Sequence, residues 1–138
     1  MECKLWLAAT RAVPADVPRA WALRDSLIKY SPTTEKAYAA VNGTAMVGGV
    51  IARAGLKDSA AHVLTSVNDR PDIDPTLDVT QTVAMYWALL GDKDKALKAL
   101  ARYLSANPAR AVGFDDEHSW EWRSIHDDPR FQALVVRK

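Results

Sequence analysis

The chain has 138 residues, 49% of them hydrophobic and 25% charged, a composition that excludes a disordered chain and fits one domain with its own core. Its 18 basic and 17 acidic side chains leave a net charge of +1, which supplies no field to hold a nucleic-acid backbone. The single cysteine, Cys3, excludes an intrachain disulfide, and we therefore expect a reducing, cytoplasmic setting.

Apolar residues recur at helical spacing along most of the chain, and no stretch alternates as a strand does. Proline and glycine interrupt this pattern and mark the ends of the predicted helices. A first short helix ends at Pro14, and Gly55 and Gly91 separate later helices. The longer helices are predicted at about 16–30, 35–54, 57–68, 76–90 and 92–106. The predicted fold class is therefore all-α.

Three glycines, Gly43, Gly48 and Gly49, lie inside the predicted helix at 35–54. Each costs about 1 kcal/mol relative to alanine in a helix interior. We therefore expect another helix to cross there, so closely that a side chain would not fit.

The sequence repeats itself at an offset of 36 residues, which places Gly55 on Gly91. Gly48 then falls on Ala84, and both are small residues. The other matched pairs are Val47 with Val83, Ile51 with Trp87, Ala60 with Ala96, Leu64 with Leu100 and Val67 with Tyr103. Self-similarity at a fixed spacing of this length predicts a helical repeat.

This pattern resembles the tetratricopeptide repeat, a helix–turn–helix unit. The resemblance implies a superhelical stack of antiparallel helix hairpins, because one hairpin cannot bury its apolar face alone. The chain departs from the family in its spacing of 36 rather than about 34 residues, and in Thr44 and Thr80, which stand where a large aromatic residue is expected. The implied divisions of a single domain 1–138 are a degenerate hairpin at 1–30, repeats at 35–72 and 76–108, and a capping tail at 112–138.

The tail also resembles the ending of many multidomain bacterial proteins whose C-terminal part is a repeat array. That resemblance implies a cap in which Trp122 or Trp120, together with Phe131, is buried on the last hairpin. It also implies that the chain is the C-terminal piece of a longer protein. Within the tail we expect a short helix near 119–125 and another that starts at Pro129.

The acidic stretch from Asp115 to Asp128, with His118 and His126, is the best candidate for a metal-dependent enzyme site. Carboxylates and imidazoles bind divalent metals, but the spacing of the two histidines matches no metal motif. A solvated stretch, or one paired with the basic segment 93–110, is the favoured alternative. His62 is expected at a surface or the edge of a groove, and we predict no metal, cofactor or catalytic residue.

Other classes of function find no support in the residues. No stretch approaches the roughly 20 apolar residues of a membrane span. The chain has neither a phosphate-binding loop nor a nucleophile elbow. Its five tryptophans stand at helical spacing with aliphatic residues, which favours core packing over the stacking of bases.

The predicted function is a non-catalytic protein–protein interaction module, the docking or sensing domain of a larger regulator. In the repeat register the first helices line a concave face, which we expect to bind a protein or peptide through Asn42, Arg53, Asp78, Gln81, Met85 and Leu89. Those places lack the set of side chains with which chaperone-binding family members clamp a carboxylate. The alternative is a structural domain that forms homo-oligomers through an open N-terminal end, at Leu5, Trp6 and Leu7.

Overall fold

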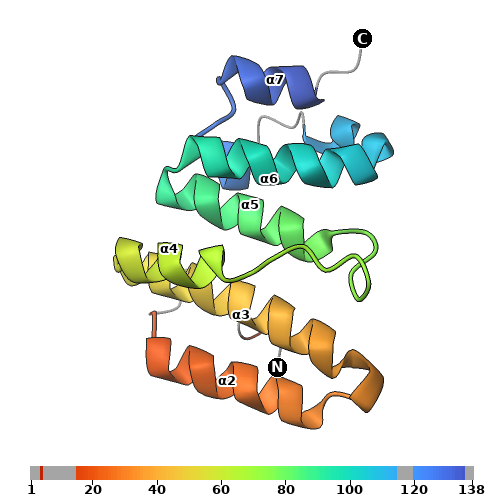
Figure 1. The fold of residues 1–138 in the computed structure, drawn as a ribbon. Helices are drawn as coiled ribbons and strands as arrows, with labels where there is room; N and C mark the ends of the chain where they lie inside the picture. Colours follow the sequence, from red (N-terminus) through yellow and green to blue (C-terminus); the bar gives the residue numbers. More distant parts are fainter. Residues whose placement is uncertain (1–3, 5–14, 115–119, 136–138) are drawn as a thin grey trace. The chain divides into compact units, whose positions relative to one another are not determined.

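The computed structural model describes residues 4, 15–114 and 120–135, and all regular structure in those ranges is helical (Figure 1). The α-helices are α2 (Val17–Tyr30), α3 (Lys36–Arg53), α4 (Lys57–Thr65), α5 (Asp78–Leu90), α6 (Lys93–Ala106) and α7 (Pro129–Val135). Three 3-10 helices accompany them, η1 (Thr33–Glu35), η2 (Pro108–Phe114) and η3 (Trp120–Trp122). The all-α prediction is therefore confirmed for the described residues, none of which forms a strand.

The predicted helix bounds agree closely with those observed. The helix expected at 57–68 is shorter and ends at Thr65, and the one expected near 119–125 is a 3-10 helix followed by turns. The first short helix predicted before Pro14 lies outside the described residues. None of the helices in the described ranges is both long and apolar enough to cross a membrane.

The predicted single domain divides into two compact units, Met1–Asp74 and Pro75–Lys138. The boundary falls at the end of the turn that the sequence predicts between its two repeats. Each unit therefore contains one of the two matched hairpins, α3–α4 in the first unit and α5–α6 in the second.

In the first unit α3 is the central helix, and α2 and α4 both pack on it. A Cβ atom built on Gly43 would lie 2.8 Å from Cγ of Arg24 in α2. A Cβ atom on Gly48 would lie 2.7 Å from a methyl carbon of Leu64 in α4. The prediction that these two glycines mark close helix crossings is confirmed.

The turns of the two hairpins have the same backbone structure. Gly55 and Gly91 take positive φ angles of 81° and 83°, a conformation that glycine adopts without steric cost. The amide of Leu56 donates to the carbonyl of Ile51, and the amide of Asp92 donates to the carbonyl of Trp87, 36 residues later. Both turns are Schellman motifs, which end a helix by satisfying its last carbonyls.

Four of the matched pairs are buried in both hairpins: Val47, Ile51, Ala60 and Leu64 in the first, and Val83, Trp87, Ala96 and Leu100 in the second. In the predicted pair of Val67 with Tyr103, Tyr103 is buried and Val67 is half-buried. The two hairpins therefore have equivalent turns and similar cores. The tetratricopeptide assignment itself stays a prediction.

In the second unit the tail covers the hairpin, with η3 against α5 and α7 against α6. The Trp122 ring lies 5.4 Å from that of Phe114 and 6.3 Å from that of Phe131, centroid to centroid. Trp122 and Phe131 are buried, whereas Trp120 is 41% exposed. The predicted pairing of one buried tryptophan with Phe131 is confirmed.

Candidate functional site

The six residues of the predicted concave face differ widely in exposure. Leu89 is 43% exposed and Asp78 is exposed, while Arg53 and Gln81 are half-buried. Asn42 and Met85 are buried, so neither offers a surface to a partner in this structure. Asn42 and Arg53 belong to the first unit, and the other four belong to the second.

Two other predicted sites fall wholly or partly outside the described residues. Leu5, Trp6 and Leu7 lie outside them, and so does the acidic run 115–118 with His118. Of the acidic tail, His126 is described, with its Nδ1 atom 3.2 Å from Asp127 Oδ1. No group of three or more metal-ligating side chains occurs in the parts of the chain that the structure describes.

In the first unit α2 and α4 both pack on α3, and two surface hollows are lined by residues of these helices and of the segment that follows α4. We call the surface that contains these two hollows the furrow. Gly43 and Gly48 lie about 140° apart around α3, at 100° per residue, so the two crossing helices occupy different flanks. Between those flanks the helical spacing places one row of α3 residues, in which Ala40 and Thr44 are half-buried while Val47 and Ile51 are buried.

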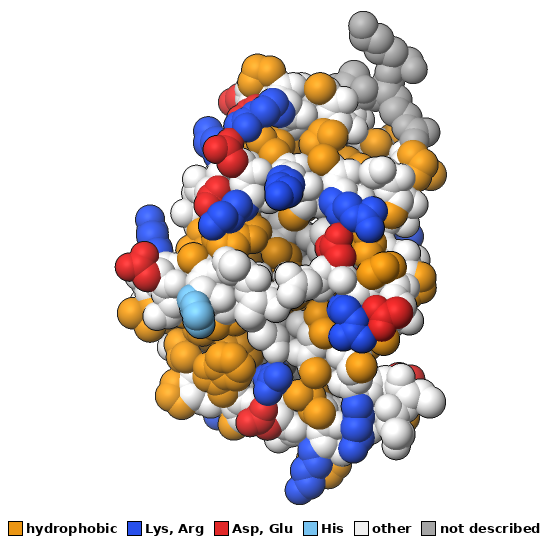
Figure 2. All heavy atoms as spheres, viewed as in Figure 1, with side chains coloured by type: hydrophobic (Ala, Val, Ile, Leu, Met, Phe, Trp, Pro, Cys, Tyr) orange, Lys and Arg blue, Asp and Glu red, His pale blue; other side chains and the backbone are white. Residues whose placement is uncertain are grey.

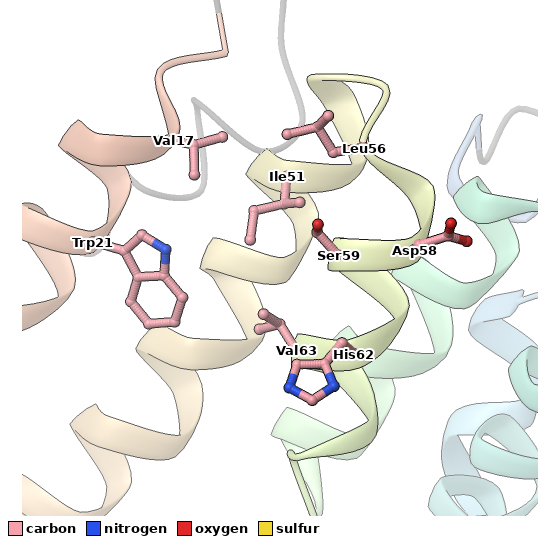
Figure 3. A pocket seen from close by; sticks show the side chains of 8 residues that line it. All are labelled: Val17, Trp21, Ile51, Leu56, Asp58, Ser59, His62 and Val63. Carbon is pink, nitrogen blue, oxygen red and sulfur yellow. The ribbon is translucent and has the colours of Figure 1, made fainter.

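One end of this furrow opens into a hollow of about 530 Å³, which we call the Trp21 groove (Figure 3). Its apolar lining comes from all three helices and the α3–α4 turn: Val17, Trp21, Ile51, Leu56 and Val63. Asp58, Ser59 and His62 of α4 complete it. Figure 2 shows apolar side chains gathered on this face over the first unit.

The polar groups of the Trp21 groove are available to a ligand. The side chains of Asp58, Ser59 and His62 make no hydrogen bond or ion pair with any other described residue, and the indole N–H of Trp21 makes none either. Figure 3 shows Ser59 between Ile51 and Asp58, and the His62 ring on the side of α4 toward the viewer. His62 is exposed and lines the groove, as predicted.

Leu56 occupies an unusual place for a leucine. It is the N-cap residue of α4, makes no side-chain capping hydrogen bond and is 53% exposed. The matching residue of the second hairpin, Asp92, has almost the same backbone angles (φ −83°, ψ 83° against φ −89°, ψ 68°). Asp92 accepts a hydrogen bond from the amide of Lys95 and so caps α6. An apolar side chain therefore stands at the groove where a capping side chain fits.

The other end of the furrow opens into a second hollow of about 350 Å³, which we call the arginine pocket. Arg24 of α2 and Arg70, beyond the end of α4, lie on its two sides. The rest of its lining is Ala40, Val41, Thr44, Ser66, Val67 and Asn68.

From the sequence, neither Trp21 nor Leu56 was assigned to a site. The one available signal was the offset of 36, which sets an apolar Leu56 against a capping Asp92. The furrow also lies about half a turn around α3 from Asn42 and Arg53, the residues of that helix predicted to bind a partner.

No protein-family model matches the chain, and no curated protein or solved structure matches it either. What the furrow does therefore has to be inferred from its own geometry and chemistry.

Proposed function

We propose that the chain is a non-catalytic protein-binding module and that its Trp21 groove holds an apolar side chain of a partner. The groove combines an aromatic ring, aliphatic side chains from three segments and hydrogen-bonding groups that no described residue uses. Such a set matches the composition of binding hot spots, in which a few aromatic and apolar anchors carry most of the affinity.

The observation that carries this proposal is the exposed Leu56 at the start of α4. A capping residue in place of an apolar one at an N-cap stabilises a helix by about 1 kcal/mol. Leu56 forgoes that stabilisation and leaves apolar surface in water, a cost that a partner covering the groove removes.

The size of the groove limits the affinity. Full burial of one leucine or phenylalanine side chain contributes about 1.5–3 kcal/mol, and a hollow of about 530 Å³ has room for one or two such side chains. We therefore expect an isolated peptide to bind no more tightly than with a micromolar dissociation constant, about −8 kcal/mol.

The test is a selection of displayed peptides on the full chain, followed by binding measurements on variants. Leu56→Asp is the decisive variant, because it supplies a cap and so removes the apolar side chain without a cost in folding. Leu89→Asp is the matched control, since it changes an equally accessible leucine of the second unit. We expect the selected peptides to contain a large apolar residue, to bind Leu89→Asp normally and to bind Leu56→Asp about tenfold more weakly.

The opposite pattern, with binding lost in Leu89→Asp and kept in Leu56→Asp, would place recognition on α5 and contradict the proposal. Sedimentation of the unliganded chain addresses the alternative of self-association. A stable oligomer that survives Leu56→Asp, in a chain that selects no peptides, would favour a structural role.

A further inference from the structure

The arginine pocket holds one guanidinium in a fixed position. Nε of Arg24 donates to Oγ1 of Thr44 at 3.1 Å, and the Thr44 hydroxyl in turn donates to the carbonyl of Ala40 at 2.7 Å. The Arg24 side chain crosses α3 at Gly43, where a Cβ atom would lie 2.8 Å from its Cγ. Its guanidinium carbon lies 5.6 Å from the centroid of the Trp21 ring. Arg24 is therefore ordered before any ligand binds.

Arg70 lines the same pocket, and one of its side-chain nitrogens makes no hydrogen bond among the described residues. Its Nε and Nη2 atoms donate to the two carboxylate oxygens of Asp72 at 2.8 and 2.6 Å, which leaves Nη1 without a hydrogen bond among the described residues. Nη2 of Arg24 also makes no hydrogen bond among the described residues, because only Nε and Nη1 of this side chain donate. The Asn68 amide also makes no hydrogen bond within those ranges. Three groups with free N–H donors thus line one hollow.

The two carboxylates that pair with these arginines do not prevent a ligand from binding. The side chains of Asp25 and Asp72 are 68% and 60% exposed, and neither residue lines the pocket. Ion pairs at that exposure contribute little to the stability of a protein. A carboxylate that enters the pocket can accept from the free Nη donors while both pairs persist, and its hydrogen bonds to guanidinium groups are of the stronger, charge-assisted kind.

The two hollows of the furrow are spaced for one short peptide. Thr44 in the arginine pocket and Ile51 in the Trp21 groove are seven residues apart on α3, which corresponds to about 10 Å along the helix axis. A peptide in the extended polyproline II conformation advances about 3.1 Å per residue with three residues per turn. Two side chains three positions apart therefore cover that distance and face the same side. Trp21 and Arg24 of α2 link the two hollows through their contact.

We propose that the furrow binds an extended acidic peptide, whose apolar side chain fills the Trp21 groove and whose carboxylate, about three residues away, is held by Arg24 and Arg70. This inference rests on the proposed function and adds the charge and the spacing of the partner sequence. The furrow is on the other side of α3 from the face that the repeat register predicts for a partner.

The probe for the test is a synthetic peptide of glycine and serine that carries one leucine and one glutamate three positions apart. A second peptide has the reverse order, because the direction of the bound chain is open, and the tighter of the two is used further. Matched peptides replace the glutamate with glutamine or the leucine with serine. The full chain, labelled with ¹⁵N, is titrated with each peptide, and the indole N–H signal of Trp21 is identified through Trp21→Phe.

We expect the glutamate peptide to bind about fivefold more tightly than the glutamine peptide, and this preference to disappear in Arg70→Gln. Lys29→Gln removes the same charge from an exposed place outside the pocket, and it should keep the preference. Arg24→Gln should also abolish the preference, and its helical circular dichroism shows whether the crossing at Gly43 remains folded.

The results separate this inference from the proposed function. If the leucine-containing peptides shift the Trp21 signal but glutamate and glutamine bind equally, the arginine pocket is not a carboxylate site and the groove proposal stands. If the glutamate preference persists in Arg70→Gln, its source is elsewhere and the inference is wrong. If no peptide shifts the Trp21 signal, both proposals are wrong.

Discussion

The hairpins α3–α4 and α5–α6 have the same turns and similar cores but different surfaces. Their turn glycines and turn hydrogen bonds coincide at an offset of 36 residues, and so do several of their buried positions. On the surface of α6, Asp94 pairs with Arg130 of the tail at 2.7 Å, and Lys95 lies 4.3 Å from the centroid of the Trp87 ring. The matching residues of α4, Asp58 and Ser59, have no such partners and line an open groove.

The two hairpins differ in whether the rest of the chain covers their surface. The second hairpin is covered by its own chain, through Trp122, Phe131 and the ion pairs of Arg130. The first hairpin shares a furrow with α2 that contains unused donors and exposed apolar surface. The buried positions therefore reflect the shared hairpin fold, while the exposed positions at the same offsets distinguish a surface covered by the tail from the surface that we propose binds a partner.

The largest effect on stability is expected when the packing of the tail on the second hairpin is weakened. Trp122→Ala should lower the free energy of unfolding by about 3–5 kcal/mol, because it empties a buried site between Phe114 and Phe131. Trp120→Ala, two residues away and 41% exposed, should cost about 1 kcal/mol or less. Urea unfolding of both variants measures the difference. Equal losses would show that the tail does not act as a cap.

The two hairpins also differ at one fully buried position, where Val50 in α3 matches Tyr86 in α5. The Tyr86 hydroxyl is buried and has no hydrogen-bond partner among the described residues, and burial raises its pKa well above the ordinary value for a tyrosine. Tyr86→Phe should therefore stabilise the protein by about 1–2 kcal/mol and raise the melting temperature by at least about 3 °C. Tyr30→Phe, at an exposed position, is the control and should change neither. A lower melting temperature for Tyr86→Phe would mean that the hydroxyl has a partner in solution.

Exchanging the two N-cap residues sharpens the comparison further. Asp92→Leu should destabilise α6 by about 1 kcal/mol, since it removes the acceptor of the Lys95 amide. Leu56→Asp should stabilise α4 by about the same amount, because the two backbones already agree. Thermal unfolding of the two variants, monitored by circular dichroism, measures both changes. If Leu56→Asp does not raise the melting temperature, an aspartate at position 56 does not cap α4. The exposed leucine would then no longer support the proposed function.

The smallest expected effect is the pH dependence of the ion pairs on α7. Hydrogen bonds from the Arg130 side chain and backbone lower the pKa of Asp128 from 3.8 to about 2. Because the pKa is lower in the folded protein, the stabilisation is complete above about pH 4 and is lost as the pH falls toward 2. Denaturant unfolding between pH 2 and 6 should show this loss in the wild type and a weaker one in Asp128→Asn. Asp58→Asn should follow the wild type, and a curve for Asp128→Asn that matches the wild type would contradict the assignment.

The sequence predicted the helices well, because their signals are local. Periodicity located the helices, and Gly55 and Gly91 ended two of them. The end of α4 was placed too late, because the hydroxyl groups of Thr65 and Ser66 bond back to carbonyls of the last turn and give no periodic signal. The start of α5 was placed two residues early, since Leu77 takes a positive φ of 55° that few leucines adopt.

The candidate site was not predictable in the same way. Periodicity places Trp21 on a helix, but it does not show that Trp21 and Leu56 line one hollow between α2 and α4. The arginine pocket needs the register of α2 on α3, which is set where Arg24 crosses Gly43. That register depends on packing between residues 19 positions apart, and a single sequence carries no direct signal of it.

The packing of α2 has a further consequence for how the protein moves. Among the described helices α2 packs on α3 alone, so it can detach through the loss of one interface while the α3–α4 hairpin stays folded. Such partial opening lets the backbone amides of α2 exchange their hydrogens with solvent. A peptide in the furrow would join α2 to α4 and oppose that opening in proportion to its affinity. Slower exchange in α2, measured helix by helix, would therefore record binding even where no side-chain signal is assigned.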